Sequence, residues 1–200
     1  SKISDPLLQE LVPDVHFKRY YKRFIGGMPF KTHFLPHPKY RRVLYIVRDG
    51  RDVMTSYYHY LTALGHDYNS IGDLIKKGDN LFPSSWDKHV RDWVNNPYKA
   101  DMLIIRYEDL LNSPEETIAQ VAEFLDLNVT MSKIEKTIHR TSFSTMQKKE
   151  KKLGWEDERQ WPKGKLFVRR GVSGGFKDEM TLEEVQLFID KSRGMLDHFG

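Results

Sequence analysis

The stretch YIVRDGRDVMTSYYHY, residues 45–60, decides the fold of this 200-residue chain. An apolar run, RRVLYIV (41–47), ends at Arg48, and a helical pattern of apolar and aromatic residues starts after a glycine turn, at Asp52. A short, β-branched apolar run with charged boundaries is typical of a buried strand. The stretch therefore predicts a strand that leads into a helix over residues 52–64, with an arginine at the junction.

Two further segments have the pattern of strands. DMLIIRY (101–107) is a second buried run, and PFKTHF (29–34) is a shorter candidate. Strands that alternate with helices predict an α/β layer fold with a mostly parallel sheet. In such sheets ligands bind outside the carboxyl ends of the strands, so Arg48 and Tyr107 should lie at the same edge.

Helical patterns lie between and after the strands, at 84–94, 113–127 and 182–199. Ser113 is a predicted N-cap with Pro114 at the first helical position, and Glu116 would complete a capping box. Thr181 is the predicted N-cap of the last helix. With no internal repeat and no low-complexity linker, a single domain over residues 1–200 is expected.

The composition limits the classes of protein. Hydrophobic residues make up 39% and charged residues 30% of the chain, and cysteine is absent. There is thus no disulfide framework, no thiolate nucleophile and no cysteine zinc site. No apolar run reaches the ~20 residues of a membrane span, and the first residues lack the apolar core of a signal peptide, so a cytoplasmic protein is expected. The net charge is +4, and its basic clusters suit an anionic partner.

Two basic elements could bind such an anion. Arg48 precedes a helix N-terminus, and Ser56 lies about one turn into that helix, so guanidinium, backbone amides and hydroxyl could converge on a phosphate. The alternative is that Arg48 only pairs with a neighbouring aspartate, Asp49 or Asp52. The second element, FVRRGVSGGFKDEMT (167–181), places two arginines before a glycine-rich segment that could form an anion nest or be a surface loop.

The segment PFKTHF also carries chemistry. Lys31 and His33 are two residues apart, so in an extended chain they point to one face. A neutral imidazole can accept a proton from a hydroxyl, and an ammonium can stabilise developing negative charge. The alternative is a structural histidine, one of eight in the chain.

Taken together, these motifs resemble one family. KTHFLP, YIVRDGRDVMTSYYHY, IIRYEDLL, RTSFSTM and FVRRGVSGGFKDEMT are similar, in the same order, to the motifs of the cytosolic-type sulfotransferases. The resemblance runs from about residue 29 to the C-terminus. It implies transfer of a sulfuryl group from 3′-phosphoadenosine-5′-phosphosulfate (PAPS) to a hydroxyl or amine of a small-molecule acceptor, without a metal. The implied fold is three-layered and P-loop-nucleotide-hydrolase-like, with a central, mostly parallel sheet.

The resemblance also implies a role for each matching residue. The residues that would hold the donor's 3′-phosphate are Arg48, Ser56, Arg169, Arg170 and Gly171. Those that would line the adenine pocket are Tyr107, Thr141 and Phe143, with Phe143 stacked on the base. His33 would be the general base, Lys31 would stabilise the transferring group, and His89 would lie near the acceptor.

The sequence departs from the family pattern in places. Gly175 and Phe176 stand where the family has Asp and Trp, and Gln186 replaces a glutamate of the short dimerisation segment, although a homodimer remains an expectation. No segment resembles the Pro-Lys-Ser-Gly-Thr-Thr-Trp loop that binds the 5′-phosphosulfate. The N-terminal strand and loop of the domain are therefore expected to be missing, and the 200-residue chain alone to be inactive.

Two alternatives stay open. One is a non-catalytic, sulfotransferase-like module that only binds the nucleotide. The other is a nucleic-acid binder that uses the basic clusters with Tyr20, Tyr21, Tyr57 and Tyr58. The interleaving of acids with the basic residues, and the absence of a nucleic-acid-binding motif, disfavour the second alternative.

Overall fold

The computed structural model describes residues 11–16, 21, 28–154, 161–162, 164–192 and 194–199. The chain divides into two compact units, residues 1–34 and residues 35–200. Each unit is described by itself below, and a single domain over all 200 residues remains a prediction.

In the first unit, one isolated parallel bridge pairs Asp14 with Lys31. The Lys31 amide donates to the Pro13 carbonyl at 3.0 Å, and the Val15 amide donates to the Lys31 carbonyl at 3.0 Å. The prediction of a strand over residues 29–34 is therefore wrong, because its described residues form this bridge and no ladder. Proline at position 29 has no amide hydrogen to donate, which works against a regular strand there.

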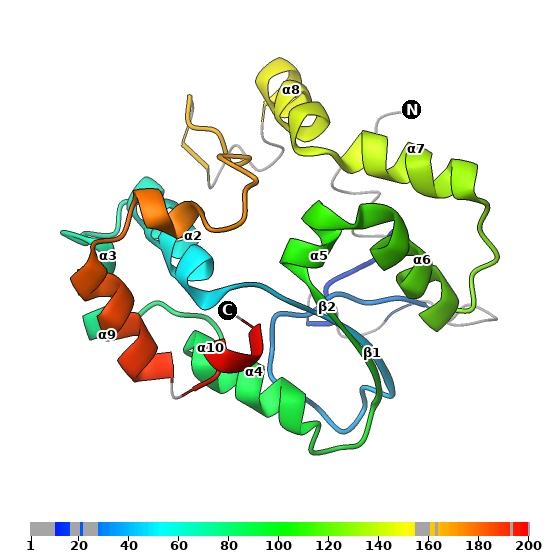
Figure 1. Ribbon diagram of the computed structural model, residues 1–200, viewed down its shortest axis with the longest axis horizontal. Coiled ribbons are helices and arrows are strands. Elements are labelled where there is room, and N and C mark those ends of the chain that lie inside the picture. The colour runs from blue at the N-terminus through cyan, green and yellow to red at the C-terminus, as the bar shows by residue number, and fades with distance from the viewer. Residues whose placement is uncertain are drawn as a thin grey trace. The chain divides into compact units, whose positions relative to one another are not determined.

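The second unit is built on two parallel strands, β1 (Arg42–Val47) and β2 (Asp101–Arg106). They pair in a register that runs from Arg42 opposite Asp101 to Val47 opposite Arg106, and Figure 1 shows them side by side. Both predicted strands are confirmed. The next residues, Arg48 and Tyr107, consequently leave the sheet at the same edge, as the α/β pattern predicted.

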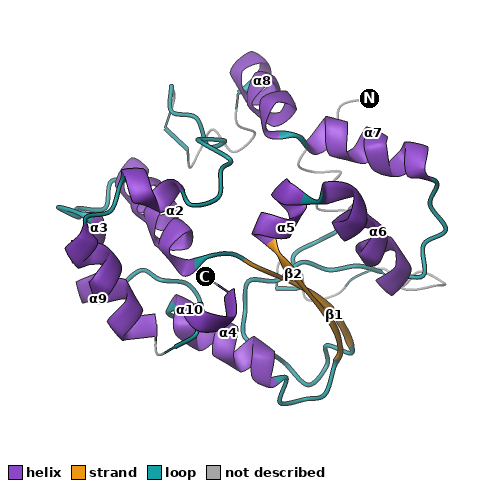
Figure 2. Cartoon of the chain, viewed as in Figure 1, coloured by secondary structure: helices purple, strands orange, loops and turns teal. Residues whose placement is uncertain are grey.

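Helices make up most of the other described elements (Figure 2). They are α2 (Gly50–Ala63), α3 (Ile71–Lys77), α4 (Trp86–Asn95), α5 (Tyr107–Asn112), α6 (Pro114–Phe124), α7 (Met131–Thr141), α8 (Phe143–Leu153), the 3₁₀ helix η1 (Gly175–Asp178), α9 (Leu182–Ser192) and α10 (Leu196–Phe199). The predicted helices over 52–64, 84–94 and 113–127 correspond to α2, α4 and α6.

Helix α2 begins two residues earlier than predicted, at Gly50. Its N-cap is Asp49, whose side chain accepts a hydrogen bond from the Arg51 amide at 2.8 Å. A Cβ atom on Gly50 would lie 2.4 Å from the Phe188 ring and 2.6 Å from the Trp86 ring. Glycine is therefore the residue that lets the helix start pass this close to α4 and α9.

Two hydrophobic clusters hold these elements together. One joins α2, α3, α9 and η1 through residues such as Met54, Leu74 and Phe188, with Phe176 among them. The other packs β1 against α4 through Tyr45, Val47, Val90 and Trp93. Phe176, which stands where the family has Trp, is 5% exposed and so fills the core as an aromatic residue should.

The predicted helix ends are partly confirmed. Ser113 is the N-cap of α6 and Pro114 is its first residue, as predicted, but the Ser113 side chain makes no capping bond, so the predicted capping box is wrong. The last helix does not run to residue 199: α9 ends at Ser192, and Gly194 has φ +80° before α10 starts. The Thr181 N-cap is confirmed, since its hydroxyl accepts from the Glu184 amide at 3.2 Å.

Candidate functional site

The site starts where the two strands end. The Arg48 guanidinium lies over the Tyr107 ring, 4.5 Å from its centroid. One residue further on, the buried Glu108 carboxylate accepts a hydrogen bond from the Asp49 amide at 3.1 Å. The end of β1 and the start of α5 are thus fixed to each other, and this fixes Arg48 against Tyr107.

Arg48 also reaches across the chain. Its Nη2 donates to the Val172 carbonyl at 2.8 Å and lies 3.3 Å from the Asp52 carboxylate. The pairing with Asp52, which the sequence left open as an alternative, is therefore present. Arg48 Nε, however, is buried and has no hydrogen-bond partner among the described residues. An unsatisfied buried donor of a cationic group calls for an explanation, and a bound anion would supply one.

The second basic element lies beside the first because Asp52 holds it there. Asp52 is 3% exposed, and its two carboxylate oxygens accept from the Gly174 amide at 2.8 Å and the Phe176 amide at 2.9 Å. These bonds join the first turn of α2 to a segment more than 120 residues away. They bring the two motifs that the sequence singled out into one place.

Helix α8 holds the other end of this segment. The buried Glu150 accepts hydrogen bonds from the amides of Phe167 and Val168, the latter at 2.8 Å. Gln147 donates to the Val168 carbonyl at 3.0 Å. The sequence analysis missed both residues. The available signal was Glu150 itself, the one acid in the lysine-rich run KKEKK.

Gly171 and Phe143 are in direct contact. Gly171 has φ +62°, and a Cβ atom there would lie 2.2 Å from the Phe143 ring. Phe143 is half-buried at the start of α8. The residue predicted to stack on adenine therefore packs against the glycine predicted to approach the 3′-phosphate.

Arg169 and Arg170 share one carboxylate. Glu179 Oε1 accepts from Arg169 Nη1 at 2.7 Å and from Arg170 Nη1 at 3.0 Å, while Oε2 contacts His59 Nε2 on α2. Burial raises the pKa of Glu179, but the hydrogen bonds from His59 and the two arginines outweigh burial and lower the pKa from 4.5 to about 2. Glu179 is thus ionised at neutral pH, and the sequence analysis did not identify it.

Ser56 and Thr141 have simpler surroundings. Ser56 is exposed on α2, one helical turn after Asp52, so its hydroxyl lies on the same side of the helix as the segment that Asp52 holds. Thr141 is exposed at the end of α7, and its hydroxyl donates to the Thr137 carbonyl of the same helix at 2.8 Å.

His89 lies elsewhere in the second unit. On α4, it packs among the rings of Tyr45 and Trp93, and its Nδ1 is 3.1 Å from the Tyr45 hydroxyl. Burial raises the pKa of Tyr45 above its ordinary value, so the hydroxyl stays neutral and can donate to the imidazole. These contacts join β1 to α4.

Lys31 and His33 belong to the first unit, and both are exposed. The Lys31 backbone forms the bridge with Asp14 described above. The structure shows the surroundings of these two residues only within the first unit, so their catalytic roles stay predictions.

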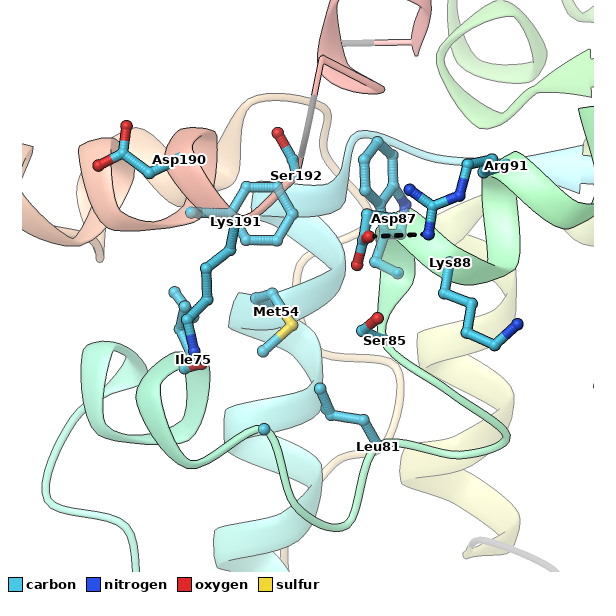
Figure 3. A pocket seen from close by; sticks show the side chains of 13 residues that line it. Met54, Ile75, Leu81, Ser85, Asp87, Lys88, Arg91, Asp190, Lys191 and Ser192 are labelled. Atoms are coloured by element: carbon cyan, nitrogen blue, oxygen red, sulfur yellow. Dashed lines mark hydrogen bonds and ion pairs between the residues drawn. The ribbon is translucent and has the colours of Figure 1, made fainter.

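A cavity of about 500 Å³ is lined by residues of α2, α3, α4 and α9 (Figure 3). Its lining includes the apolar side chains of Met54 and Trp86 and the basic side chains of Lys88, Arg91 and Lys191. In Figure 3 Arg91 is paired with Asp87. None of the predicted site residues is among those that line this cavity, so the predicted nucleotide site is a different surface.

Among the described residues there is no group of three or more His, Asp or Glu side chains that could hold a metal ion. The described helices are also too short or too polar to cross a membrane.

Comparisons with known proteins bear on the family and the fold of the chain. The model of the family described as "Sulfotransferase domain" matches residues 25–195. Sulfotransferase 1B1 of Mus musculus is 26% identical over 204 residues, which are 92% of this chain and 66% of that protein. Sulfotransferase 1A1 of Bos taurus is 28% identical over 158 residues, which are 74% of this chain and 52% of that protein. The chain thus spans between about half and two thirds of the length of these relatives.

Two solved structures share the fold. Retinol dehydratase in complex with androsterone and the inactive cofactor PAP has a TM-score of 0.63 and 23% identity, over 76% of this chain and 47% of that one. Mouse sulfotransferase SULT7A1 complexed with PAP has a TM-score of 0.61 and 23% identity, over 77% of this chain and 57% of that one. At this identity the similarity supports the α/β fold with its parallel sheet.

Proposed function

Because the chain belongs to the sulfotransferase domain family, we propose that it carries the 3′-phosphate and adenine sites of a PAPS-dependent sulfotransferase. PAP, present in the two similar structures, is adenosine 3′,5′-bisphosphate, the product that remains when PAPS has lost its sulfuryl group. In the complete enzyme the acceptor would be a hydroxyl or amine of a small molecule.

The observation that carries the proposal is the junction of the two basic elements. Arg48 Nη2 donates to the Val172 carbonyl at 2.8 Å, in the segment that follows Arg169 and Arg170. Asp52 and Glu150 fix that segment by its backbone amides. Arg48 is therefore held against the segment that carries Arg169 and Arg170, and a phosphate dianion is a ligand that several guanidinium groups can bind together.

In this proposal Arg48, Ser56, Arg169, Arg170 and Gly171 bind the 3′-phosphate. The partnerless Nε of Arg48 fits this assignment, because a phosphate oxygen would complete its hydrogen bonding. The residues proposed to contact adenine are Tyr107, Thr141 and Phe143. Tyr107 and Phe143 offer aromatic faces beside Arg48 and Gly171 respectively.

For the chemical step we propose His33 as general base and Lys31 as the residue that stabilises the leaving oxygen. The donor supplies the sulfuryl group. His33 accepts the proton of the acceptor hydroxyl as that oxygen bonds to sulfur and the bond from sulfur to the bridging oxygen breaks. Lys31 offers its ammonium to the negative charge on that oxygen. His89 stays a prediction on the acceptor side, although its contacts with Tyr45 and Trp93 also give it a structural role.

The test is calorimetric binding of adenosine 3′,5′-bisphosphate and adenosine 5′-monophosphate. Arg48→Ala and Arg169→Ala should each weaken binding of the bisphosphate by roughly 1.5–3 kcal/mol, because each removes charge-assisted hydrogen bonds. Binding of the monophosphate, which has no 3′-phosphate, should hardly change. Equal losses for both ligands would contradict the assignment.

The second candidate is a module that binds the nucleotide without catalysis. What favours it is that no segment of these 200 residues resembles the 5′-phosphosulfate loop. Both candidates predict the same binding results. They differ in turnover, which the complete enzyme should show with PAPS and a hydroxylated acceptor and the non-catalytic module should not.

A further inference from the structure

Glu179 pairs with both arginines of the segment Arg169-Arg170-Gly171, here called the RRG motif. Its Oε1 accepts from Arg169 at 2.7 Å and from Arg170 at 3.0 Å. The Glu179 side chain is 18% exposed, whereas the two arginine side chains are 36% and 35% exposed. The carboxylate is thus more buried than the two arginine side chains with which it pairs.

Two other carboxylates, Asp52 and Asp178, pair with arginines that are proposed to bind the 3′-phosphate. Both differ from Glu179. Asp52 pairs with Arg48, but its oxygens also accept two backbone amides, so its first task is to hold the chain. Asp178 pairs with Arg170 Nη2, but its side chain is 65% exposed, where solvent screens the interaction. Glu179 is the more buried of the two acids that pair with Arg169 and Arg170, and its side chain contacts both arginines and the His59 imidazole.

We propose that Glu179 determines the affinity of the site for a 3′-phosphate, because its carboxylate occupies Arg169 and Arg170 when no nucleotide is bound. The inference rests on the proposed function, in which those arginines bind that phosphate. A phosphate dianion must then displace Glu179 or share the arginines with it. If the phosphate shares the arginines, two negative charges lie close together and repel each other; if it displaces Glu179, the ion pairs of that carboxylate are lost. Both outcomes weaken binding.

The alternative role of Glu179 is to position the two arginines for the phosphate. If Glu179 mainly positioned the arginines, its removal would free their side chains and weaken binding of the phosphate. The two roles therefore predict opposite signs for the effect of one substitution.

The experiment is a titration of the 200-residue protein with adenosine 3′,5′-bisphosphate, followed by the ³¹P resonances of the two phosphates. Glu179→Gln removes the charge and keeps the shape. Glu179→Asp keeps the charge and serves as the conservative rescue. Glu183→Gln, at an exposed position four residues further on, removes the same charge from the protein as a whole and is the matched control.

Glu179→Gln should bind the bisphosphate roughly 3- to 10-fold more tightly than wild type, as expected for removing one partly screened negative charge beside a dianion. Glu179→Asp and Glu183→Gln should bind as wild type does. The affinity for adenosine 5′-monophosphate should be the same in all four proteins. Circular dichroism confirms that each variant is folded.

Unchanged or weaker binding of the bisphosphate by Glu179→Gln would overturn the inference and leave the proposed function standing, provided that wild type prefers the bisphosphate. If wild type binds bisphosphate and monophosphate equally, and Arg169→Ala changes neither, the proposed function fails and the inference fails with it. The monophosphate series separates these two results.

Discussion

Arg48 shows how a single side chain can serve both interpretations of its sequence position. It pairs with Asp52 at 3.3 Å, which is the structural alternative, and it leaves a buried Nε without a partner, which is what a ligand-binding arginine would do. The pair with Asp52 holds the guanidinium near Tyr107 before any ligand arrives. A preordered arginine loses less side-chain entropy on binding than a free one.

Glu179 gives a prediction about pH and stability. Its pKa is lowered from 4.5 to about 2 in the folded protein, so its ionised form stabilises the fold above pH 4.5, and this contribution is lost as the pH falls from 4.5 to 2. Wild type should therefore have a higher melting temperature than Glu179→Gln at neutral pH, and the difference should shrink toward zero near pH 2. The contributions of the other acidic residues to stability are common to both proteins and cancel in this difference. Thermal unfolding at a series of pH values measures it, and a difference independent of pH would contradict the assignment.

His33 gives a prediction about turnover. In the complete enzyme, His33→Ala should leave donor binding near wild type and reduce turnover by at least ~10²-fold, since a general base of this kind contributes about that much. A structural histidine would instead lower the melting temperature, with turnover reduced only in proportion. Steady-state kinetics together with thermal unfolding distinguish the two, and the second pattern would remove His33 from the catalytic residues.

At the scale of elements, the RRG segment owes its path to Gly171. With φ +62° and the Phe143 ring 2.2 Å from where a Cβ would lie, Gly171→Ala should both strain the backbone and displace Phe143. We expect a loss of about 1–2 kcal/mol in the free energy of unfolding from the backbone alone. Displacing Phe143 should also weaken the binding of adenosine 5′-monophosphate, because Phe143 is the proposed adenine contact.

Gly174→Ala is the matched control for that variant. Gly174 has a similar φ of +72°, but the nearest atom to its would-be Cβ is 3.9 Å away, on the Lys177 side chain. It should therefore carry the backbone strain without moving Phe143. Denaturant unfolding should show a loss in both variants, the larger one in Gly171→Ala, and calorimetry should show a loss of monophosphate affinity in Gly171→Ala alone. Equal affinity losses would mean that Phe143 does not contact adenine.

The elements also show what the sequence could and could not predict. The two strands were predictable, because short β-branched apolar runs with charged ends are typical of buried strands. The meeting of Arg48 with Tyr107 followed from parallel pairing. The anchoring roles of Glu150 and Glu179 were not predictable, because their partners lie nine or more residues away and an acid beside basic residues is typical of a solvated surface.

Two errors at helix ends have a related cause. The capping pattern at Ser113 and the helical pattern through Gly194 are both local signals. At Ser113 the N-cap position was predicted correctly, and the error lies in the side-chain bond of the capping box, which α6 lacks. At Gly194 the apolar periodicity continued in the sequence, but the backbone turned to positive φ, which glycine allows at little cost.

At the scale of the whole molecule, the sheet is small for the fold that it belongs to. In the described part of the chain it has two strands, both parallel. Tyr45 and Val47 on one face of β1 are buried against α4, whereas Ile46 on the other face is 54% exposed. Strands in parallel sheets are usually apolar on both sides because both faces are covered. Together with the spans of 66% and 52% of two longer relatives, this predicts a 200-residue chain of marginal stability that tends to associate.

In the 200-residue chain, binding of the nucleotide should be separable from catalysis of sulfuryl transfer. The residues proposed to bind the 3′-phosphate and adenine are present, but no segment resembles the loop that holds the 5′-phosphosulfate in the family. Losing even one preorganised donor to the reacting group can cost about 10²–10³-fold in rate, and this loop supplies several. The 200-residue chain should therefore bind adenosine 3′,5′-bisphosphate weakly and show no measurable sulfuryl transfer, while a chain extended upstream should bind tightly and turn over.

Assays of both chains with PAPS and a simple phenol or alcohol test this. Robust turnover by the 200 residues would show that another segment of this chain supplies the donors, and the basic stretch KRYYKR (18–23), most of which lies outside the described residues, would be the first place to look.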